Sequence, residues 1–302
     1  MKRPIIIDCD PGLDDSIALI AAHKIQDIEV VGITTTAGNA SLERTSKNAL
    51  NLLDTLEWEI PVVMGSEHPL TRERKLSNKK PGIGDVVLQE SNREFYKMNV
   101  TDFIYEEAKK QNGNLEILTL APMTNIARTL IRYPDIKGLI KSITFMGGTT
   151  GEGNITSSSE FNMYIDPHAA DIVFKSGIPL TMVGLDVTKK AFLTLEDIDY
   201  FKKFNNIHSQ LTAQLLMAIH DRECLCGEDA IVIHDAVALG VMVFPEIVKK
   251  RKFSVSIEIN SKQNLGMLLL DYRNIPDEER NIDIAIDIDV DKFKHWIKGL
   301  SC

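Results

Sequence analysis

The sequence predicts an α/β protein built on a mainly parallel β-sheet with helices on both faces. Apolar runs rich in β-branched residues alternate along the chain with segments of helical periodicity. The runs are almost continuously apolar, which is typical of strands that are buried on both faces. The intervening segments are long enough to contain the helical crossover that two parallel strands need. In such a sheet, ligands bind at the carboxyl ends of the strands.

The apolar runs and the periodic segments can be assigned in chain order. The expected strands are residues 3–8, 29–36, 60–65, 115–120, 141–147, 178–184, 252–260 and 281–290. The expected helices are residues 13–23, 41–56, 101–111, 123–133, 166–176, 194–204, 208–221 and 234–247. No low-complexity tract, Gly/Ser linker or internal repeat divides the chain, so residues 1–302 are expected to form a single domain.

Composition and charge limit the function. The chain has 302 residues, of which 44% are hydrophobic, and a net charge of -9, so nothing favours binding to nucleic acid or to an anionic membrane. The short basic clusters at 72–75 and 249–252 are interpreted as solvated surface. The N-terminus lacks the apolar segment of a signal peptide, and we expect a cytoplasmic protein with reduced cysteines.

Four aspartates follow the first expected strand in the stretch "IIIDCDPGLDD". Asp8 and Asp10 lie at the carboxyl end of the strand, and Asp14 and Asp15 fall in the first turn of the next helix. The helix dipole favours negative charge there by about 1 kcal/mol at most, which is weak compensation for several converging carboxylates. A hard divalent cation would neutralise them, and ligation by oxygen alone favours Ca²⁺ or Mg²⁺ over zinc.

Two other interpretations of the aspartates are open at this point. The cluster could be a solvated acidic cap of the helix. It could also belong to a phosphatase of the haloacid dehalogenase type, which likewise begins with a strand followed by D-x-D. That class usually carries Thr or Val two residues after the second aspartate, where this chain has Gly12, and its downstream lysine and acidic pair cannot be placed here.

The chain resembles the inosine-uridine-preferring nucleoside hydrolases. The octet "DCDPGLDD" looks like their N-terminal signature, and the resemblance continues in order along nearly the whole chain. The further motifs are "TTTAGN" ending at Asn39, "LAPMTNIA" at 120–127, "FMGG" at 145–148, "GNITSSSEFNMYIDPHAA" at 153–170 and "HDAVAL" at 234–239. Their fold is expected here, with a small helical insertion near 185–235 that roofs the pocket.

The resemblance implies a Ca²⁺ site. Its ligands would be Asp10, Asp15, the backbone carbonyl of Leu120 and Asp235. Three carboxylates and a carbonyl leave room on a hard cation for water and sugar hydroxyls. Asp10 would also be the catalytic general base that takes a proton from the attacking water. Asp8 would either orient its neighbours or simply cap the end of the strand.

The resemblance also implies residues that bind the ribose. Asp14 and Asn162 would contact the 2′- and 3′-hydroxyls, with Asn39 close by. Glu160 and Asn154 match positions that bind the 5′-hydroxyl. Each asparagine near a glycine could instead occupy a turn, which is the simpler interpretation of such a residue taken alone.

The leaving base has a different set of expected contacts. His234 precedes the expected ligand Asp235, and it would protonate or hydrogen-bond the departing base as a second catalytic residue. Met146 would lie beside the sugar and is equally well explained as part of the core. Many relatives carry a histidine in a loop reading H-G-x-S/T-G-L, whereas this chain has Asn78 in "NKKPGIGD". The base preference is therefore left open.

The resemblance implies Ca²⁺-dependent hydrolysis of the N-glycosidic bond of ribonucleosides to ribose and a free base. The expected role is purine and pyrimidine nucleoside salvage by a homodimer or homotetramer that acts on a small molecule. The alternative is a non-catalytic, Ca²⁺-dependent protein that binds a nucleoside or ribose. Release of reducing sugar from inosine and uridine would separate the two.

Overall fold

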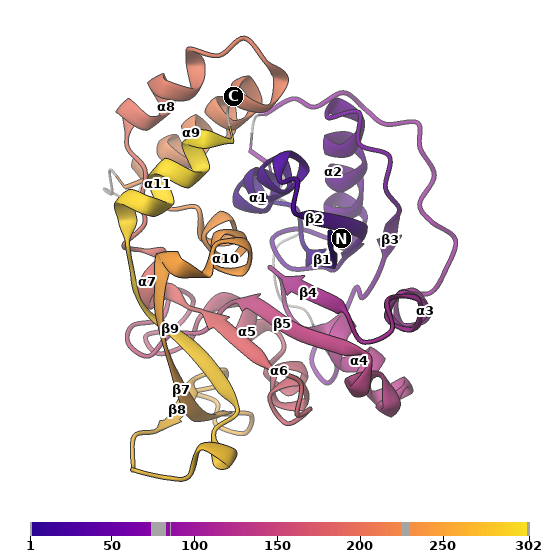
Figure 1. Cartoon of the computed structure of the whole chain (residues 1–302), viewed down its shortest axis with the longest axis vertical. Coiled ribbons are helices and arrows are strands. Elements are labelled where there is room, and N and C mark those ends of the chain that lie inside the picture. Colours follow the sequence, from indigo (N-terminus) through magenta and orange to yellow (C-terminus); the bar gives the residue numbers. More distant parts are fainter. Residues whose placement is uncertain (1, 74–82, 85, 225–229, 301–302) are drawn as a thin grey trace.

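The structure is a computed structural model that describes residues 2–73, 83–84, 86–224 and 230–300. Nine strands form one sheet in the order β3-β2-β1-β4-β5-β6-β9-β7-β8 (Figure 1). The strands are β1 (Arg3–Cys9), β2 (Ile28–Thr35), β3 (Val62–Met64), β4 (Leu115–Thr119), β5 (Ile140–Met146), β6 (Leu180–Val183), β7 (Val248–Ile257), β8 (Leu268–Asp271) and β9 (Ile282–Ile288).

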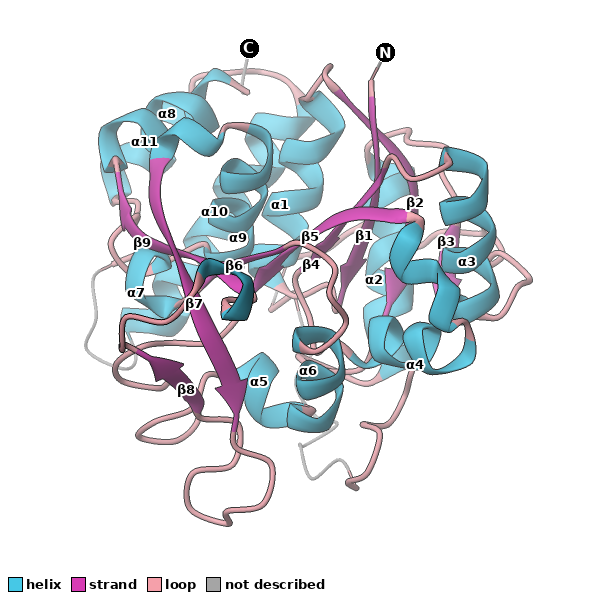
Figure 2. Ribbon diagram, turned by 60° about the horizontal axis from the view of Figure 1, so that its bottom comes forward, coloured by secondary structure: helices cyan, strands magenta, loops and turns pink. Residues whose placement is uncertain are grey.

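The strand directions confirm the predicted parallel sheet. Strands β1 to β6 and β9 all run in the same direction, and β7 is antiparallel to both of its neighbours, β9 and β8. Because β9 is placed between β6 and β7, the hairpin of β7 and β8 extends the sheet at one edge (Figure 2).

Helices cover both faces of the sheet (Figures 1 and 2). The α-helices are α1 (Leu13–Lys24), α2 (Leu42–Thr55), α3 (Val100–Gln111), α4 (Thr124–Arg132), α5 (Phe161–Ile165), α6 (Pro167–Phe174), α7 (Leu185–Thr188), α8 (Leu195–Lys202), α9 (Ile207–Cys224), α10 (His234–Val243) and α11 (Val290–Gly299). Short 3-10 helices follow α4 (Pro134–Gly138), α10 (Pro245–Ile247) and β8 (Asp277–Glu279).

The first strand shows how the sequence builds two cores. Ile5 and Ile7 pack into a cluster with residues of α1 and α10, whereas Ile6 packs into a second cluster with residues of α3 and α4. Successive side chains of a strand point to opposite faces, so an uninterrupted apolar run serves both clusters. The sheet is thereby held rigidly between two helical layers, and its carboxyl edge is a fixed platform for the loops that follow.

The structure corrects several expected boundaries. Strand β7 begins at Val248, so it includes the basic residues 249–252, all of which are exposed as expected of solvated surface. The expected helix over 234–247 ends at Val243, because Pro245 cannot continue an α-helix and begins a 3-10 turn. Strand β8 and the short helices α5 and α7 were not predicted. Their four or five residues give no periodic pattern.

Helices α7, α8 and α9 lie between β6 and α10 in the chain, where the helical insertion near 185–235 was expected. They gather with α11 on one side of the molecule (Figure 1). Within the described ranges, no helix combines the length and the apolar character that crossing a membrane requires.

Candidate active site

The candidate residues lie where parallel strands end. Asp10 follows β1, Asn39 follows β2, Leu120 follows β4, and Met146 is the last residue of β5. Carboxyl ends of parallel strands meet along one edge of a sheet, and in doubly wound folds this edge binds the ligand. The sheet order brings these residues together, because β2, β1, β4 and β5 are adjacent strands.

Three carboxylates converge at this edge. Asp14 and Asp15 are in the first turn of α1, and Asp235 is in the first turn of α10. Oxygen atoms of the three side chains lie within 4.8 Å of one another, and Asp15 and Asp235 are buried. The two helices pack against each other and both begin at this edge, so their first turns face a common point. This arrangement can hold a metal ion.

The position of Asp15 is fixed by the backbone around it. Its Oδ1 accepts a hydrogen bond from the backbone N–H of Asp10 (3.0 Å), and its Oδ2 accepts one from that of Gly12 (3.0 Å). A side-chain hydrogen bond also joins Asp15 to Asp235. Two carboxylates in such contact must share either a proton or a cation. The backbone therefore holds one ligand group rigidly, as a preformed metal site requires.

Burial and the closeness of the carboxylates raise the pKa values of Asp15 and Asp235. Burial, followed by the charge of Asp14, raises the pKa of Asp15 to about 7. Burial and the charges of Asp14, Asp15 and Asp10 raise the pKa of Asp235 well above its ordinary value. Among the described residues, no lysine or arginine forms an ion pair with these carboxylates. The all-oxygen, buried, uncompensated donor set fits a hard divalent cation.

Asp10 lies outside the group of three close carboxylates found among the described residues, which are those of Asp14, Asp15 and Asp235. One of its oxygens, Oδ2, accepts a short hydrogen bond from the backbone N–H of Asn39. A Cβ atom on Gly38 would lie 2.1 Å from that oxygen, so only glycine lets the loop after β2 approach this closely. Burial and the charge of Asp15 raise the pKa of Asp10 well above its ordinary value, so Asp10 lies within the same electrostatic cluster.

Asp8 is turned away from the metal candidates. Its carboxylate accepts hydrogen bonds from Thr34 Oγ1 (2.5 Å), Asn125 Nδ2 (2.7 Å) and Thr119 Oγ1 (3.4 Å). Burial raises the pKa of Asp8 to about 6, and these hydrogen bonds oppose the rise. Because the donors come from β2, β4 and α4, Asp8 ties three elements together below the site.

Asn162 joins the ends of two strands. Its Nδ2 donates to the carbonyl of Leu120 (2.9 Å) and to the carbonyl of Met146 (3.2 Å). The side chain is buried, as are those of Leu120 and Met146. The structure thus places an expected sugar-binding amide directly against the carbonyl expected to bind the metal.

Glu160 is buried beneath the start of α5. Its Oε1 accepts from the backbone N–H of Asn162 (2.9 Å), and its Oε2 accepts from those of Gly148 (3.0 Å) and Met163 (3.1 Å). Burial raises the pKa of Glu160, and these N–H groups oppose the rise. Asn154 is exposed, and its Oδ1 caps the N–H of Phe161 (2.9 Å). Both side chains therefore cap the first turn of α5, the helix that carries Asn162.

His234 begins α10, next to Asp235. Its Nδ1 lies 2.7 Å from the hydroxyl of Thr188, which is completely buried at the end of α7. Burial lowers the pKa of His234, and the charge of Asp14 opposes this effect. The imidazole therefore lies close enough to Asp14 to feel its charge. Asn78, the other residue expected near the base, lies outside the described residues.

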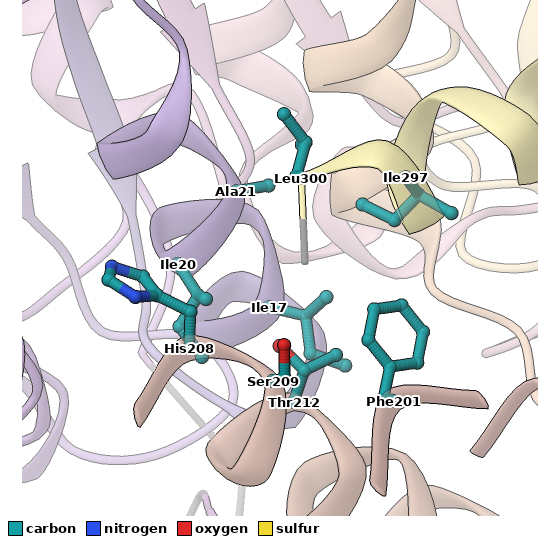
Figure 3. A pocket seen from close by; sticks show the side chains of 9 residues that line it. All are labelled: Ile17, Ile20, Ala21, Phe201, His208, Ser209, Thr212, Ile297 and Leu300. Carbon is teal, nitrogen blue, oxygen red and sulfur yellow. The ribbon is translucent and has the colours of Figure 1, made fainter. Parts of the chain in front are cut away.

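A cavity between α1, α8, α9 and α11 is unsuited to a nucleoside (Figure 3). Its volume is about 10 Å³, which is room for roughly one water molecule. Apolar side chains such as Ile17, Phe201 and Ile297 line most of it. The converging carboxylates make the carboxyl edge of the sheet the candidate site.

The chain matches a known protein family over nearly its whole length. The family model described as inosine-uridine preferring nucleoside hydrolase matches residues 5–295. The chain belongs to this family. Its members are N-glycosidic hydrolases, and the match includes every candidate residue above.

Individual relatives match this chain over nearly their full length. The chain is 37% identical to the pyrimidine-specific ribonucleoside hydrolase RihA of Photobacterium profundum, covering 97% of this chain and 96% of the relative. It is 36% identical to RihA of Salmonella agona with the same coverage. The solved purine-preferring ribonucleoside hydrolase of Gardnerella vaginalis superimposes with a TM-score of 0.91 at 31% identity, covering 99% of both chains. The nucleoside hydrolase fold is thereby confirmed.

Sequence reasoning missed the residues that support the site from behind. Thr188, which contacts His234, and Asn125, which binds Asp8, were not singled out. Asn125 lies inside the motif "LAPMTNIA" and could have been questioned on that ground. Thr188 gives no comparable signal, because its partner is 46 residues away in the chain.

Proposed function

We propose that this protein hydrolyses the N-glycosidic bond of ribonucleosides, releasing ribose and a free base, with a bound Ca²⁺ ion. One observation carries the proposal: the carboxylates of Asp14, Asp15 and Asp235 converge at the carboxyl edge of the sheet, in a chain that belongs to the nucleoside hydrolase family. Water attacks C1′ of the sugar, the bond to the base breaks, and the base leaves with the bonding electron pair.

The residues proposed to hold the ion are Asp10, Asp15, Asp235 and the carbonyl oxygen of Leu120. All four donors are oxygen atoms, which suits Ca²⁺. An oxygen atom of Asp14 lies within 4.8 Å of those of Asp15 and Asp235, which supports its proposed contact with sugar hydroxyls beside the ion. When bound, a divalent cation supplies Lewis acidity and a fixed positive charge for the oxygen atoms around it.

Asp10 is proposed as the general base. Its Oδ2 is occupied by the N–H of Asn39, so the opposite oxygen is the one that can accept a proton from water. Asn39 Nδ2 also donates to Asp15 Oδ2 (3.1 Å), which links the loop after β2 to the cluster of Asp14, Asp15 and Asp235. Asp10 is thus held in one orientation, as a base acting on a positioned water must be.

The sugar is proposed to bind between the carboxylates and the loop before α5. Asn162 and Asp14 would contact the 2′- and 3′-hydroxyls, with Asn39 close by, and Met146 would pack beside the ring. Glu160 and Asn154 would serve the 5′-hydroxyl. As the bond to the base lengthens, the sugar develops positive, oxocarbenium-like charge, which the surrounding carboxylates stabilise.

His234 is proposed to activate the leaving base. A natural base departs poorly as an anion, so a hydrogen bond or proton from the imidazole lowers the barrier. The nitrogen opposite the one bound to Thr188 is left for this contact. Asp14 lies close enough for its charge to act on the imidazole.

The preferred substrates are proposed to be pyrimidine ribonucleosides. The relatives with 36–37% identity over 97% of the chain are named pyrimidine-specific hydrolases, which supports this choice. The proposed role is nucleoside salvage in the cytoplasm, by a homodimer or homotetramer whose protomer is a single domain.

A panel of nucleosides tests the proposal. Release of reducing sugar should be measured from uridine, cytidine, inosine, adenosine and 2′-deoxyuridine, with Ca²⁺ present. We expect turnover of uridine and cytidine above the purines, and little turnover of the deoxynucleoside, which lacks one of the two bound hydroxyls. Binding of uridine without release of ribose would instead identify a non-catalytic binding protein. Faster turnover of purines would refute the base preference alone.

A further inference from the structure

The contact between Thr188 and His234 links two helices that the function needs together. Thr188 ends α7, and His234 begins α10 (Figure 1). The hydroxyl of Thr188 is fully buried and lies 2.7 Å from Nδ1 of the imidazole. At that distance, and with the Thr188 side buried, the hydrogen bond restricts the orientation of the ring.

The chemistry of the partner matters as much as its position. An imidazole has two ring nitrogens, and a hydrogen bond at one determines what the other can do. A carbonyl or carboxylate at Nδ1 could only accept, so a neutral ring would present Nε2 without a proton. A hydroxyl can also donate to Nδ1, and Nε2 of a neutral ring then carries the proton and can act as a donor.

We propose that Thr188 is a positioning residue for the departure of the base, which orients His234 so that the N–H of Nε2 is directed at the leaving base. The inference rests on the proposed role of His234 as the group that contacts that base. Thr188 itself touches no substrate. Its effect is transmitted only through the imidazole, so it should depend on how much help the leaving group needs.

Paired substrates isolate this effect. Uridine has a poor leaving group, whereas the nitrophenolate of p-nitrophenyl riboside departs without a proton. Thr188→Val keeps the shape of the side chain and removes the hydroxyl, and Thr188→Ser restores it. We expect Thr188→Val to lower kcat on uridine by about 10-fold or more, within the range of lost orientation. Hydrolysis of p-nitrophenyl riboside should change less than twofold, and Thr188→Ser should stay within about threefold of the wild type on both.

A matched control separates this role from the general loss of a buried hydroxyl. Thr129 is also buried, and its Oγ1 donates to the carbonyl of Asn125 (2.7 Å) within α4. Thr129→Val should leave the ratio of the two substrates unchanged. In the double variant with His234→Ala, Thr188→Val should add no further loss on uridine, because both act through one group.

Nitrogen NMR of the labelled imidazole gives a readout without turnover. The His234 signals, assigned by comparison with His234→Ala, should show the proton on Nε2 in the wild type and lose that preference in Thr188→Val. An unchanged tautomer in Thr188→Val would overturn the proposal, as would equal slowing of both substrates or no slowing of either. If His234→Ala itself slows both substrates equally, the proposed role of His234 fails first. A selective His234→Ala with a non-selective Thr188→Val would refute only the role of Thr188.

Discussion

Buried carboxylates have opposite electrostatic surroundings at the two edges of the sheet. At the amino edge, Glu116 near the start of β4 is buried but pairs with Arg3 (2.6 Å) and Lys141 (2.9 Å), which lie near the starts of β1 and β5. At the carboxyl edge of the same strands, Asp10, Asp15 and Asp235 are equally buried and crowd one another. At the amino edge the chain itself neutralises the carboxylate, whereas at the carboxyl edge a bound ion is proposed to do so.

The pKa values express this difference. Burial opposes ionisation of Glu116, but the hydrogen bonds and charges of Arg3 and Lys141 prevail and lower its pKa. At the carboxyl edge, burial and neighbouring negative charges act in the same direction and raise the pKa of Asp15 to about 7. Compensated charge therefore stabilises the fold, and uncompensated charge is concentrated where chemistry is proposed.

Removal of the metal should have the largest effect. We expect EGTA to abolish turnover of uridine and to lower the melting temperature by roughly 5 °C, since an ion bound only by the folded state stabilises it. Added CaCl₂ should restore both. Turnover that persists after exhaustive chelation, in protein shown by elemental analysis to hold no metal, would contradict the proposed site.

Asp10→Asn should separate activity from stability. It keeps an oxygen for the ion and for the N–H of Asn39 but removes most of the basicity, so kcat on uridine should fall by at least about 100-fold. The metal-free protein should melt no lower than the wild type, because one of the repelling buried charges is gone. A variant within threefold of wild-type kcat would exclude Asp10 as the base.

Glu116→Gln should show the reverse pattern. Loss of the carboxylate leaves Arg3 and Lys141 without their partner, and the free energy of unfolding should fall by about 1–3 kcal/mol in urea titrations. The kcat value should stay within twofold of the wild type. Glu106→Gln is the control, because Glu106 forms an exposed pair with Lys109 that should contribute little to stability. Equal destabilisation by both variants would remove the contrast between buried and exposed pairs.

The pH dependence of stability is the subtlest expected difference. Because the folded-state pKa of Asp15 is raised from its ordinary value of 3.8 to about 7, metal-free protein should lose stability as the pH rises across that range. Saturating Ca²⁺ should reduce this slope, and so should Asp15→Asn in the metal-free protein, while the raised pKa values of other buried aspartates such as Asp8 keep part of it. Melting temperatures of metal-free protein that stay flat or rise across this range would show that the carboxylates are not mutually destabilising. Glu116 has a lowered pKa, so its contribution is lost only as the pH falls into the acid range.

Much of the fold could be predicted from the sequence, because the long apolar runs can form only strands that are buried on both faces. The first strand was expected over 3–8 and is Arg3–Cys9. Strand β8 was missed, since four residues carry no pattern of their own. The placement of β9 between β6 and β7 was also beyond prediction, because strand order depends on which hydrophobic faces meet in the folded protein.

The candidate site was predictable in its members but not in its internal contacts. The motifs gave Asp10, Asp15 and Asp235 as ligands, whereas the structure packs Asp14 with Asp15 and Asp235 and turns Asp10 toward the N–H of Asn39. Differences of a few ångströms in loop geometry determine which of these side chains contact one another. They depend on features such as the closeness of Gly38 to Asp10, which the sequence alone does not show.

The hairpin of β7 and β8 supports helix α5, which carries Asn162, and the loop before it. The hydroxyl of Ser159 donates to the carbonyl of Leu265 (2.8 Å) at the hairpin, and a Cβ atom on Gly266 would lie 2.7 Å from the Cα of Tyr164 in α5. Among the described strands, the hairpin joins the rest of the sheet through β9, which comes last in the sequence. During synthesis, the loop therefore gains its support only after residues 282–288 have emerged from the ribosome. A nascent chain that stops short of β9 would have all the proposed catalytic residues but no finished site.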